Sequence, residues 1–359
     1  MLSKITILIT DITKSAGTER VVVNLSNSFV ELGYDVEIVS FNSKTGSPYY
    51  TLNENVNVVH WRLKQYENQL YIKKIFYFLV NLFFVYKKIR KINNSIIIGT
   101  SRNVNIYSLL FLKNHNRFIA CEHFSCKSQM SRLMRLIRDC FYLKLKYLVV
   151  LTEFDKQYYR KRRINAITIP NFVDIQFNGA FHEKQNIILA VGRHSIEKNF
   201  EGLVKIWASI YNKFPNWKLQ IVGDGFLFNQ NKRLAEELDV KNIEFLPFTK
   251  DIFSFYEKAS IYTMTSLNEA FPMVLLEAMS HKVVCVSFDC DSGPREIINN
   301  TNGFLVPIGD NSRFIASLKL LIENEDIRYK MSNNAFDSIK RFSKDSILKK
   351  WSSLFELVK

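Results

Sequence analysis

The sequence lacks the cysteine pattern of secreted or zinc-stabilised modules. Of its 359 residues five are cysteine, and no two of them form a Cys-x-x-Cys pair. An odd number of cysteines without that spacing argues against a disulfide framework and a zinc ribbon. Long apolar runs are also missing: the longest, Ile75 to Phe84, is interrupted by Asn81 and falls short of the roughly 20 residues that a spanning helix needs. These absences favour a protein of the reducing cytosol that does not cross a bilayer.

Glycine and proline are scarce, at 12 and 7 residues, whereas 47% of the residues are hydrophobic and 23% are charged. This composition excludes collagen-like and disordered chains and supplies ample material for packed cores. The N-terminus shows no secretory signal, because the short strand-like run Ile5 to Thr10 is followed by Asp11. The chain length exceeds the size at which one hydrophobic core usually keeps growing, so we expect two domains.

Acidic side chains are few in the first half of the chain. Residues 1–170 carry 26 Lys and Arg against 11 Asp and Glu, while residues 171–359 carry 23 of each. The whole net charge of +15 therefore belongs to the first half, and it is densest in residues 62–163, among many aromatic residues. A solvated positive face is one explanation. The density favours an anionic partner, for which a nucleic acid and an anionic membrane surface both remain open.

Short β-branched runs alternate with helical patterns along the whole chain. The runs predict strands at Lys4 to Thr10, Val36 to Phe41, Ile96 to Ile98, Phe118 to Cys121, Tyr147 to Leu151, Ile187 to Val191, Leu219 to Val222, Ile261 to Met264 and Val283 to Ser287. Apolar positions at three- and four-residue spacing predict helices after Thr18, Glu197, Phe228, Pro272, Asp310 and Asp326. This alternation is typical of an α/β protein with parallel sheets.

The alternation restarts after the polar segment Asp174 to Lys184. We therefore expect two doubly wound, Rossmann-like domains, residues 1–178 and 179–359, with the last helix able to pack back on the first domain. Domains of this kind bind ligands at the carboxyl ends of their strands, so the cleft between the two is the expected site.

A strand, a polar turn and a helix meet around Pro272, which suits a first helical position. The backbone amides at this helix end belong to Phe271, Met273 and Val274. They form a positive end that can bind phosphate or sugar oxygens. Glu269 lies in the turn and Glu277 about one helical turn further in, so two carboxylates bracket one predicted anion site. The alternative is that Glu269 is only a charge at a helix N-terminus and Glu277 a solvated surface residue.

Two cations follow the strand predicted at Ile187 to Val191. Arg193 and Lys198 stand five residues apart in the turn before the next helix. An Arg fork with a Lys point charge at the carboxyl end of a strand suits a diphosphate. A third turn, Gly223-Asp224-Gly225, also follows a strand, where its glycines permit either a close backbone approach or simply a tight turn.

Together these segments resemble the retaining nucleotide-sugar glycosyltransferases of family 4, which have the two-domain GT-B fold. The similarity rests on the order and spacing of Gly192-Arg193 with Lys198-Asn199, Val222-Gly223-Asp224-Gly225, and Glu269-Ala270-Phe271-Pro272 with Glu277-Ala278-Met279. Similar segments at Gly17 to Val21, Glu122-His123, Ile169 to Asp174 and Ser292 to Ile298 extend it over nearly the whole chain. The pattern is most similar to that of bacterial polyprenol-diphosphate-linked N-acetylhexosamine transferases.

The resemblance implies a role for each matching residue. Arg193 and Lys198 hold the donor diphosphate, and Glu277 the ribose hydroxyls. Glu269, with the amides of Phe271 and Met273, holds the transferred sugar. Gly17 lines the cleft from the first domain, and His123 approaches the sugar from there, although a histidine after a strand is also a common structural residue. Ala270 and Pro247 stand where the family usually has glycine, which bears on the identity of the donor.

The resemblance implies no metal and no other cofactor. Asp289-Cys290-Asp291 has the Asp-x-Asp form that chelates Mn²⁺ or Mg²⁺ in the other major glycosyltransferase fold. We interpret it as incidental, because Arg193 and Lys198 already neutralise the phosphates and a divalent ion is not needed for charge.

The implied reaction moves a hexose or N-acetylhexosamine from a nucleoside diphosphate, with UDP expected, to a hydroxyl with retention at the anomeric carbon. No residue has the features of a committed nucleophile. In the family the attack is thought to come from the same face, and the diphosphate itself helps to take the acceptor proton. We expect the acceptor to be a polyprenol-diphosphate-linked glycan in the assembly of a bacterial surface polysaccharide.

A membrane surface is the expected location of that acceptor. On Tyr71 to Ile92 an apolar, aromatic core is flanked by cations, as in interfacial helices. The cations are Lys73, Lys74, Lys87, Lys88, Arg90 and Lys91. Arg132, Arg135 and Arg138 recur at three-residue spacing on a second predicted helix. The alternative is that Ile75 to Tyr86 is a buried core helix. We expect a cytoplasmic enzyme held peripherally on the inner face of the plasma membrane.

Two other functions fit parts of the sequence. A UDP-sugar epimerase of the same two-domain architecture needs no acceptor, but its soluble substrate gives no reason for the basic first half. A non-enzymatic nucleic-acid-binding protein would use the positive charge, but the sequence has no helix-turn-helix, zinc or RNP signature. Such a protein has no use for Arg193, Lys198, Glu269 and Glu277 together, so we expect no nucleic acid partner.

Overall fold

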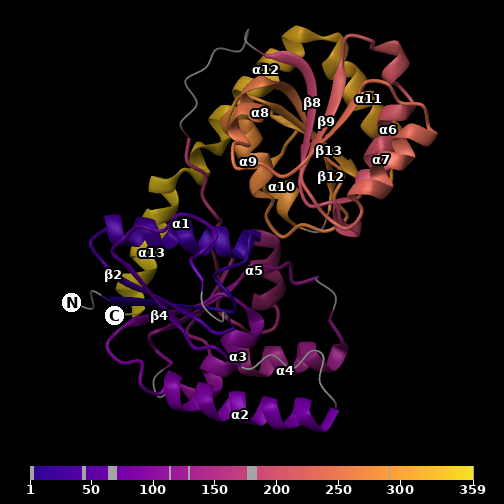
Figure 1. Ribbon diagram of the computed structural model, residues 1–359. Helices are drawn as coiled ribbons and strands as arrows, with labels where there is room; N and C mark the ends of the chain where they lie inside the picture. The colour runs from indigo at the N-terminus through magenta and orange to yellow at the C-terminus, as the bar shows by residue number, and fades with distance from the viewer. Residues whose placement is uncertain are drawn as a thin grey trace. The chain divides into compact units, whose positions relative to one another are not determined.

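The computed structural model describes residues 4–42, 46–63, 71–112, 115–127, 130–175, 184–290 and 292–358, and of residues 71–76, 78 and 79 the backbone alone. The chain forms two compact units (Figure 1), Met1–Ile169 with Leu348–Lys359, and Pro170–Ile347. The boundary predicted between residues 178 and 179 lies outside the described residues.

The first unit is built on a seven-stranded sheet in the order β3-β2-β1-β4-β5-β6-β7. Its strands are β1 (Lys4–Ile9), β2 (Asp35–Ser40), β3 (Val56–His60), β4 (Ile96–Gly99), β5 (Phe118–Glu122), β6 (Tyr147–Val150) and β7 (Ala166–Thr168). All neighbours are parallel, and Ile7 of β1 stands opposite Ile38 of β2 and Ile98 of β4. Leu8, Phe118 and other apolar strand residues form the core.

Five helices of the first unit connect these strands. They are α1 (Gly17–Glu31), α2 (Tyr71–Ile89), α3 (Arg102–Phe111), α4 (Arg132–Tyr142) and α5 (Glu153–Arg160). The last helix, α13 (Lys344–Val358), begins in the second unit, and its final part belongs to the first. There Trp351 and Phe355 pack edge-on against Phe29 of α1, with ring centres 5.7 and 5.2 Å away.

The second unit is built on a six-stranded parallel sheet in the order β10-β9-β8-β11-β12-β13. Its strands are β8 (Gln185–Val191), β9 (Lys218–Val222), β10 (Ile243–Leu246), β11 (Ala259–Met264), β12 (Val284–Asp289) and β13 (Gly303–Pro307). Its helices are α6 (Phe200–Ala208), α7 (Phe228–Glu237), α8 (Phe253–Lys258), α9 (Met273–Ser280), α10 (Gly293–Ile297), α11 (Asn311–Glu323) and α12 (Glu325–Ser338). Ile188, Ile221 and Ile261 lie in its core.

Both sheets reverse their strand order beside their first strand, between β1 and β4 in one unit and between β8 and β11 in the other. Ligands of open α/β sheets bind at the carboxyl ends of the strands at this reversal. The prediction of an α/β protein with two doubly wound, Rossmann-like domains is confirmed. None of the helices in the described part of the chain has the length and apolar character of a membrane-spanning segment.

All nine predicted strands are present, but the sequence did not indicate β3, β7, β10 and β13. These four are the edge strands of the two sheets. Most of their side chains are only half-buried, whereas the inner strands are buried almost throughout. A strand with one partner has less apolar surface to cover, so its hydrophobic pattern is weak.

Candidate active site

The turns that follow β8 and β11 are tied together at the strand reversal of the second unit. Asn199 caps α6 in the left-handed conformation, with φ of 51°, and its side chain donates to the Thr265 carbonyl oxygen at 3.3 Å. The Thr265 hydroxyl in turn donates to the Asn199 carbonyl oxygen at 3.0 Å. The Leu267 amide donates to the Glu197 carbonyl oxygen at 2.7 Å. Because these bonds fix both turns, they also fix the side chains that the turns carry.

Lys198 and Glu269 meet across these two turns and form an ion pair between Nζ and Oε1. The Ser266 hydroxyl donates to the same carboxylate oxygen at 3.0 Å. The two side chains retain 24% and 16% of their exposure, so both are reachable from solvent. Arg193 is exposed on the same edge of the sheet. The structure therefore brings together Lys198 and the first carboxylate that the sequence indicated, and it places Arg193 in the turn after β8 on the same edge.

Two glycines of the third turn let it lie directly on the turn after β8. Gly223 has φ of +143°, and a Cβ there would lie 2.0 Å from the Gly192 carbonyl oxygen. Gly225 has φ of +154°, and its Cβ would lie 2.5 Å from the His194 carbonyl oxygen. The His194 amide donates to the Asp224 carbonyl oxygen at 2.8 Å. The close approach permitted by these glycines is therefore to the neighbouring backbone.

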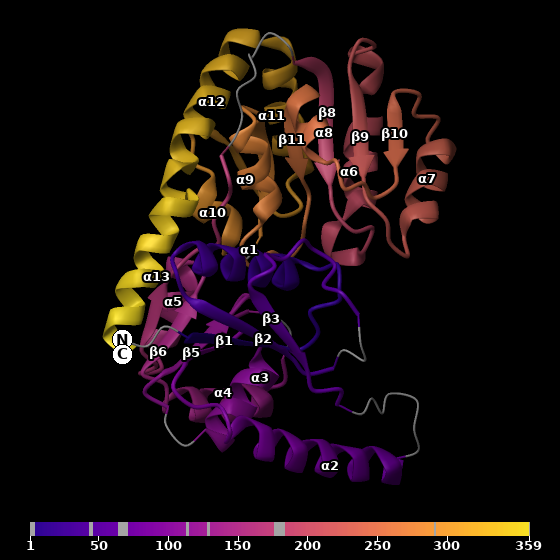
Figure 2. The same cartoon turned by 60° about the vertical axis from the view of Figure 1, so that its left-hand side comes forward.

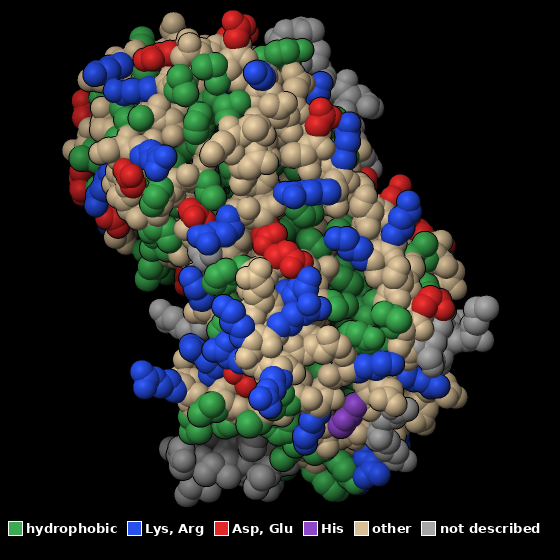
Figure 3. Space-filling view, turned by 180° about the vertical axis from the view of Figure 1, so that it is seen from behind, with side chains coloured by type: hydrophobic (Ala, Val, Ile, Leu, Met, Phe, Trp, Pro, Cys, Tyr) green, Lys and Arg blue, Asp and Glu red, His purple; other side chains and the backbone are tan. Residues whose placement is uncertain are grey.

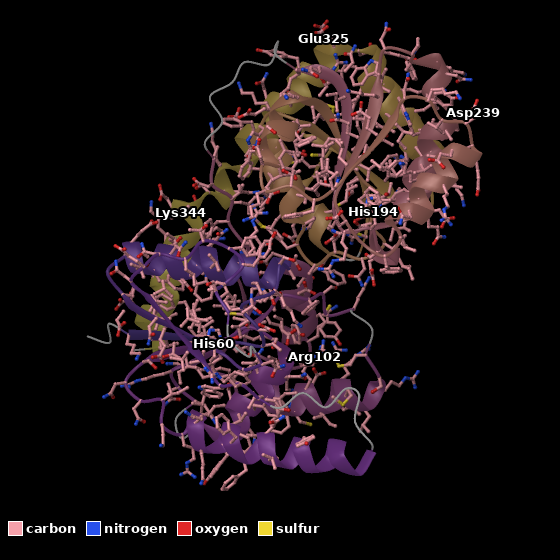
Figure 4. The ribbon with its side chains drawn as sticks, viewed as in Figure 1. His60, Arg102, His194, Asp239, Glu325 and Lys344 are labelled. Atoms are coloured by element: carbon pink, nitrogen blue, oxygen red, sulfur yellow. The ribbon has the colours of Figure 1, made fainter. Side chains whose placement is uncertain are left out.

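His194 is a buried residue of this edge that sequence reasoning missed. It lies at the strand ends of the second unit (Figure 4), with its ring edge-on to Phe200 and Phe228. Its Nδ1 is 2.9 Å from the side-chain nitrogen of Asn231. Burial lowers the pKa of His194 to about 4, so the ring is neutral at pH 7. The sequence around His194 does not show whether this histidine is buried for packing or exposed to bind a ligand.

Helix α9 begins at Met273 with Pro272 as its N-cap residue. Met273 and Val274 are half-exposed at this end, whereas the Phe271 side chain is buried against Phe342 at 5.5 Å between ring centres. Glu277 is buried. The alternative of a solvated surface residue is therefore wrong for Glu277.

Glu277 has a partner that the sequence did not reveal, the Tyr256 hydroxyl, which donates to its Oε2 at 3.1 Å. Tyr256 lies on α8, and it is fully buried beside His281. The contact joins α8, which ends directly before β11, to α9, which begins after the turn that follows β11. The two residues are 21 positions apart, so no local motif could predict it.

Asp289 of the Asp-x-Asp segment is paired with a guanidinium. Arg295 donates from Nε and Nη2 to the two carboxylate oxygens at 2.9 and 2.8 Å. Asp291 lies outside the described residues. In the described ranges no cluster of three or more His, Cys, Asp or Glu side chains could hold a metal ion. Independence of metal stays a prediction.

Gly17 and His123 belong to the first unit, at the carboxyl edge of its sheet. Gly17 is the first residue of α1, and a Cβ added there would meet no atom of the described residues within 4 Å. His123 follows β5, and its Nδ1 is buried with no hydrogen-bond partner among the described residues. Burial lowers the pKa of His123 to about 4. The neighbouring Glu122 is buried, accepts from the Tyr142 hydroxyl and has its pKa raised by burial.

Helix α2 is buried on one side and exposes cations beside its C-terminal end on another, so the alternative of a core helix holds in part and membrane contact stays a prediction. Val85 and Ile89 are buried in the core, while Lys87, Lys88, Arg90 and Lys91 are exposed. The Lys87 Nζ lies 4.5 Å from the ring centre of Phe83, and Lys88 and Arg90 lie over Phe84 and Tyr86. The side chains of Lys73 and Lys74 lie outside the described residues.

The three arginines of α4 do not share one solvated face. Arg132 is exposed, but Arg138 is completely buried. The expectation that the spacing of Arg132, Arg135 and Arg138 marks a basic surface is therefore wrong for Arg138, because its guanidinium pairs with Asp139.

Comparisons with known proteins decide the family. Residues 15–177 match the family model described as Glycosyltransferase Family 4, and residues 172–338 match that described as Glycosyl transferases group 1. The amylovoran biosynthesis glycosyltransferase AmsD of Erwinia amylovora is 32% identical over 368 residues, which cover 98% of this chain and 99% of that protein. The chain belongs to glycosyltransferase family 4. The predicted resemblance is thereby confirmed, and the enzyme is a glycosyltransferase.

Two further relatives of this family 4 glycosyltransferase are informative. The Campylobacter jejuni GalNAc-alpha-(1->4)-GalNAc-alpha-(1->3)-diNAcBac-PP-undecaprenol alpha-1,4-N-acetyl-D-galactosaminyltransferase is 28% identical over 354 residues, 96% of each chain. The structure of a TarM mutant of S. aureus, in complex with fondaparinux, alpha-GlcNAc-glycerol and UDP, covers 98% of this chain and 99% of that one, with a TM-score of 0.80 and 17% identity. This likeness confirms the GT-B fold.

Proposed function

We propose that this glycosyltransferase moves a hexose or N-acetylhexosamine from UDP to a polyprenol-diphosphate-linked glycan, with retention at the anomeric carbon, in polysaccharide assembly. The observation that carries the donor assignment is the pairing of Lys198 with Glu269 across the turns after β8 and β11, at the strand reversal of the second unit, with Arg193 exposed in the first of these turns. Two relatives support the chemistry: one is a transferase that acts on a PP-undecaprenol glycan, and the TarM complex holds UDP.

In this proposal Lys198 exchanges partners when the donor binds. Its ammonium is paired with Glu269. A diphosphate beside Lys198 and the exposed Arg193 offers more charge than one carboxylate, so Lys198 turns to the phosphates and Glu269 is released to the hydroxyls of the sugar. As the glycosidic bond breaks, negative charge grows on the leaving diphosphate, and the two cations stabilise it.

The remaining site residues contribute binding and orientation. The N-terminus of α9, where Met273 and Val274 are half-exposed, has backbone amides that favour a negatively charged ligand. Glu277, in the second turn of that helix, holds the ribose. His123 is neutral at pH 7 because its pKa is about 4, so we assign it a hydrogen bond to the sugar. No metal takes part. Arg295 already satisfies both oxygens of Asp289, which supports this assignment.

We place the enzyme in the cytoplasm, held peripherally on the inner face of the plasma membrane, where lipid-linked acceptors are made. Support comes from α2, whose exposed cations lie over aromatic rings, and from the surplus of Lys and Arg in residues 1–170. Figure 3 shows many Lys and Arg side chains on one face of the molecule. Each cation near anionic lipid contributes about 1 kcal/mol to binding.

One assay separates this proposal from its alternatives. The enzyme is incubated with candidate UDP-sugars, with and without undecaprenyl-diphosphate-linked glycan, and UDP release and lipid products are measured. UDP release that requires the acceptor, with an α-linked product from an α-linked donor by NMR, is the expected result. Free UDP with a changed sugar and no acceptor would establish an epimerase. Absence of turnover with every UDP-sugar would overturn the assignment of UDP as the carrier of the donor sugar.

A further inference from the structure

Helix α4 has its polar and apolar sides reversed for a helix of a soluble domain. The side chains that it buries completely are Arg138 and Tyr142. Leu133 and Leu136 are 67% and 64% exposed, and Met134 and Ile137 on the same side are exposed as well. A surface helix normally turns its apolar stripe inward. Here four neighbouring apolar side chains form an exposed face, which we call the outer face of α4.

Buried polar contacts hold α4 in this orientation. The Arg138 guanidinium donates twice to Asp139, at 2.9 and 2.7 Å, and lies 4.9 Å from the ring centre of Tyr159. The Tyr142 hydroxyl donates to buried Glu122 and accepts from Asn105 at 3.2 Å. Arg138 and Asp139 belong to the same helix and would move together if α4 rolled to bury its leucines. The roll would, however, take Tyr142 away from buried Glu122, Asp139 away from Arg162 and Arg138 away from Tyr159, and the loss of a partner is strongly unfavourable for a buried polar group. The outer face is therefore fixed toward the outside of this unit.

The surroundings of the outer face are basic. Residues 71–152 contain 15 Lys and Arg but only two acidic residues, Glu122 and Asp139. Glu122 is buried and Asp139 is paired with Arg138 and Arg162. Helices α2, α3 and α4 lie next to one another in both ribbon views (Figures 1 and 2), so the outer face of α4 has as a near neighbour a helix that exposes Phe83, Lys87 and Lys88. Apolar side chains among cations match an anionic lipid interface.

We propose that the outer face of α4 inserts into the interfacial region of an anionic bilayer, while the cations of α2 contact the lipid headgroups. The proposal rests on the membrane location proposed above and goes beyond it, because it adds an apolar insertion by a different helix. Salt screens the contact of α2 but leaves the insertion of α4 intact. The two contributions are therefore separable by ionic strength.

Cys140 allows the insertion to be observed directly. It is exposed one turn after Leu136, whereas the other four cysteines, Cys121, Cys126, Cys285 and Cys290, are buried. An environment-sensitive fluorophore can therefore be attached to Cys140 of the full chain, with Cys140→Ser as the labelling control. Vesicles of phosphatidylglycerol and phosphatidylcholine should raise the fluorescence, and nitroxide groups on the lipid acyl chains should quench it. Unchanged fluorescence with vesicles that do bind the enzyme would overturn the insertion.

Matched variants provide a second test of the insertion of α4. The double variant Leu133→Gln, Leu136→Gln keeps charge and helix propensity, and its control is Leu238→Gln, Leu320→Gln in the second unit, at sites 42% and 37% exposed. In about 1 M salt only apolar contact persists. Under these conditions Leu133→Gln, Leu136→Gln should bind vesicles about tenfold or more weakly than wild type, whereas the control variant should bind them as tightly as wild type. Circular dichroism checks that both are folded. Equal binding by the two double variants refutes the proposal.

Further outcomes distinguish this inference from the proposed function. If the enzyme inserts through α4 but transfers no sugar to a lipid-linked acceptor, the acceptor assignment fails and the insertion stands. If wild type is a dimer that Leu133→Gln, Leu136→Gln separates, as measured by light scattering, a second copy covers the outer face and the insertion is refuted. UDP binding by the α4 variant should equal that of wild type in every case, because the donor residues belong to the second unit.

Discussion

From the ion pair between Lys198 and Glu269 we predict that removal of the carboxylate increases the affinity for UDP. If Lys198 leaves Glu269 to reach the diphosphate, the pair must be broken whenever UDP binds. A partly exposed pair of this kind contributes about 1 kcal/mol at most, and Glu269→Gln removes that cost. Glu269→Gln should therefore bind UDP about fivefold more tightly than wild type, although it lowers kcat because Gln cannot hold the sugar as a carboxylate does.

Removal of the lysine from the same pair should lower the affinity for UDP. Lys198→Ala removes a charge-assisted contact with the diphosphate, which is worth roughly 2 kcal/mol, so UDP should bind about 30-fold more weakly. Arg193→Ala should lower affinity similarly. Titration calorimetry of UDP measures all three variants, and the double variant Lys198→Ala, Glu269→Gln isolates the coupling. Near-wild-type affinity in both Arg193→Ala and Lys198→Ala would refute the diphosphate assignment, and weaker binding by Glu269→Gln would refute the partner exchange.

Three further predictions concern the remaining site residues. Glu277→Gln should mainly raise the donor KM, by about tenfold for one charged hydrogen bond lost, whereas Tyr256→Phe, which removes its buried partner, should have a smaller effect in the same steady-state assay. Activity should persist in EDTA and Asp289→Ala should be mild; restoration of chelator-abolished turnover by Mn²⁺ would show a metal enzyme. Burial lowers the pKa of His123 and His194 from 6.5 to about 4, so the unfolded chain binds more protons between these values, and thermal melting should show that stability rises as the pH is raised through this window and is lost as the pH is lowered through it.

The sequence predicted what depends on local pattern. Inner strands such as β8 and β11 are buried on both faces, so their apolar runs are continuous and their ends lie where the glycines and charges begin. The site residues after β8 and β11 could therefore be located before the structure was known. Parallel pairing of the two strands then places Arg193, Lys198 and Glu269 on one edge, which is a consequence of topology rather than of any single motif.

The sequence could not predict contacts that join distant segments. The Tyr256 bond to Glu277 links helices α8 and α9, and the packing of Gly225 on His194 links two turns. Arg138 is the clearest case, because its spacing from Arg132 indicates a solvated face, yet Asp139 and two tyrosines provide it with a buried environment. A charged residue in a helix is therefore poor evidence of exposure until its partners are known.

The candidate donor site and helix α2 present positive charge in different ways, and the difference fits the roles proposed for them. At the donor site Lys198 is paired with Glu269, so a ligand has to compete with a carboxylate for the lysine. Such competition favours a compact, highly charged ligand such as a diphosphate. On α2 of the first unit, Lys87 and Lys88 instead lie over phenyl rings, which attract cations without neutralising them. Cations held in this way keep a long-range field, as the membrane contact that we propose for α2 requires, whereas a paired cation suits the short-range recognition that we propose for the donor site.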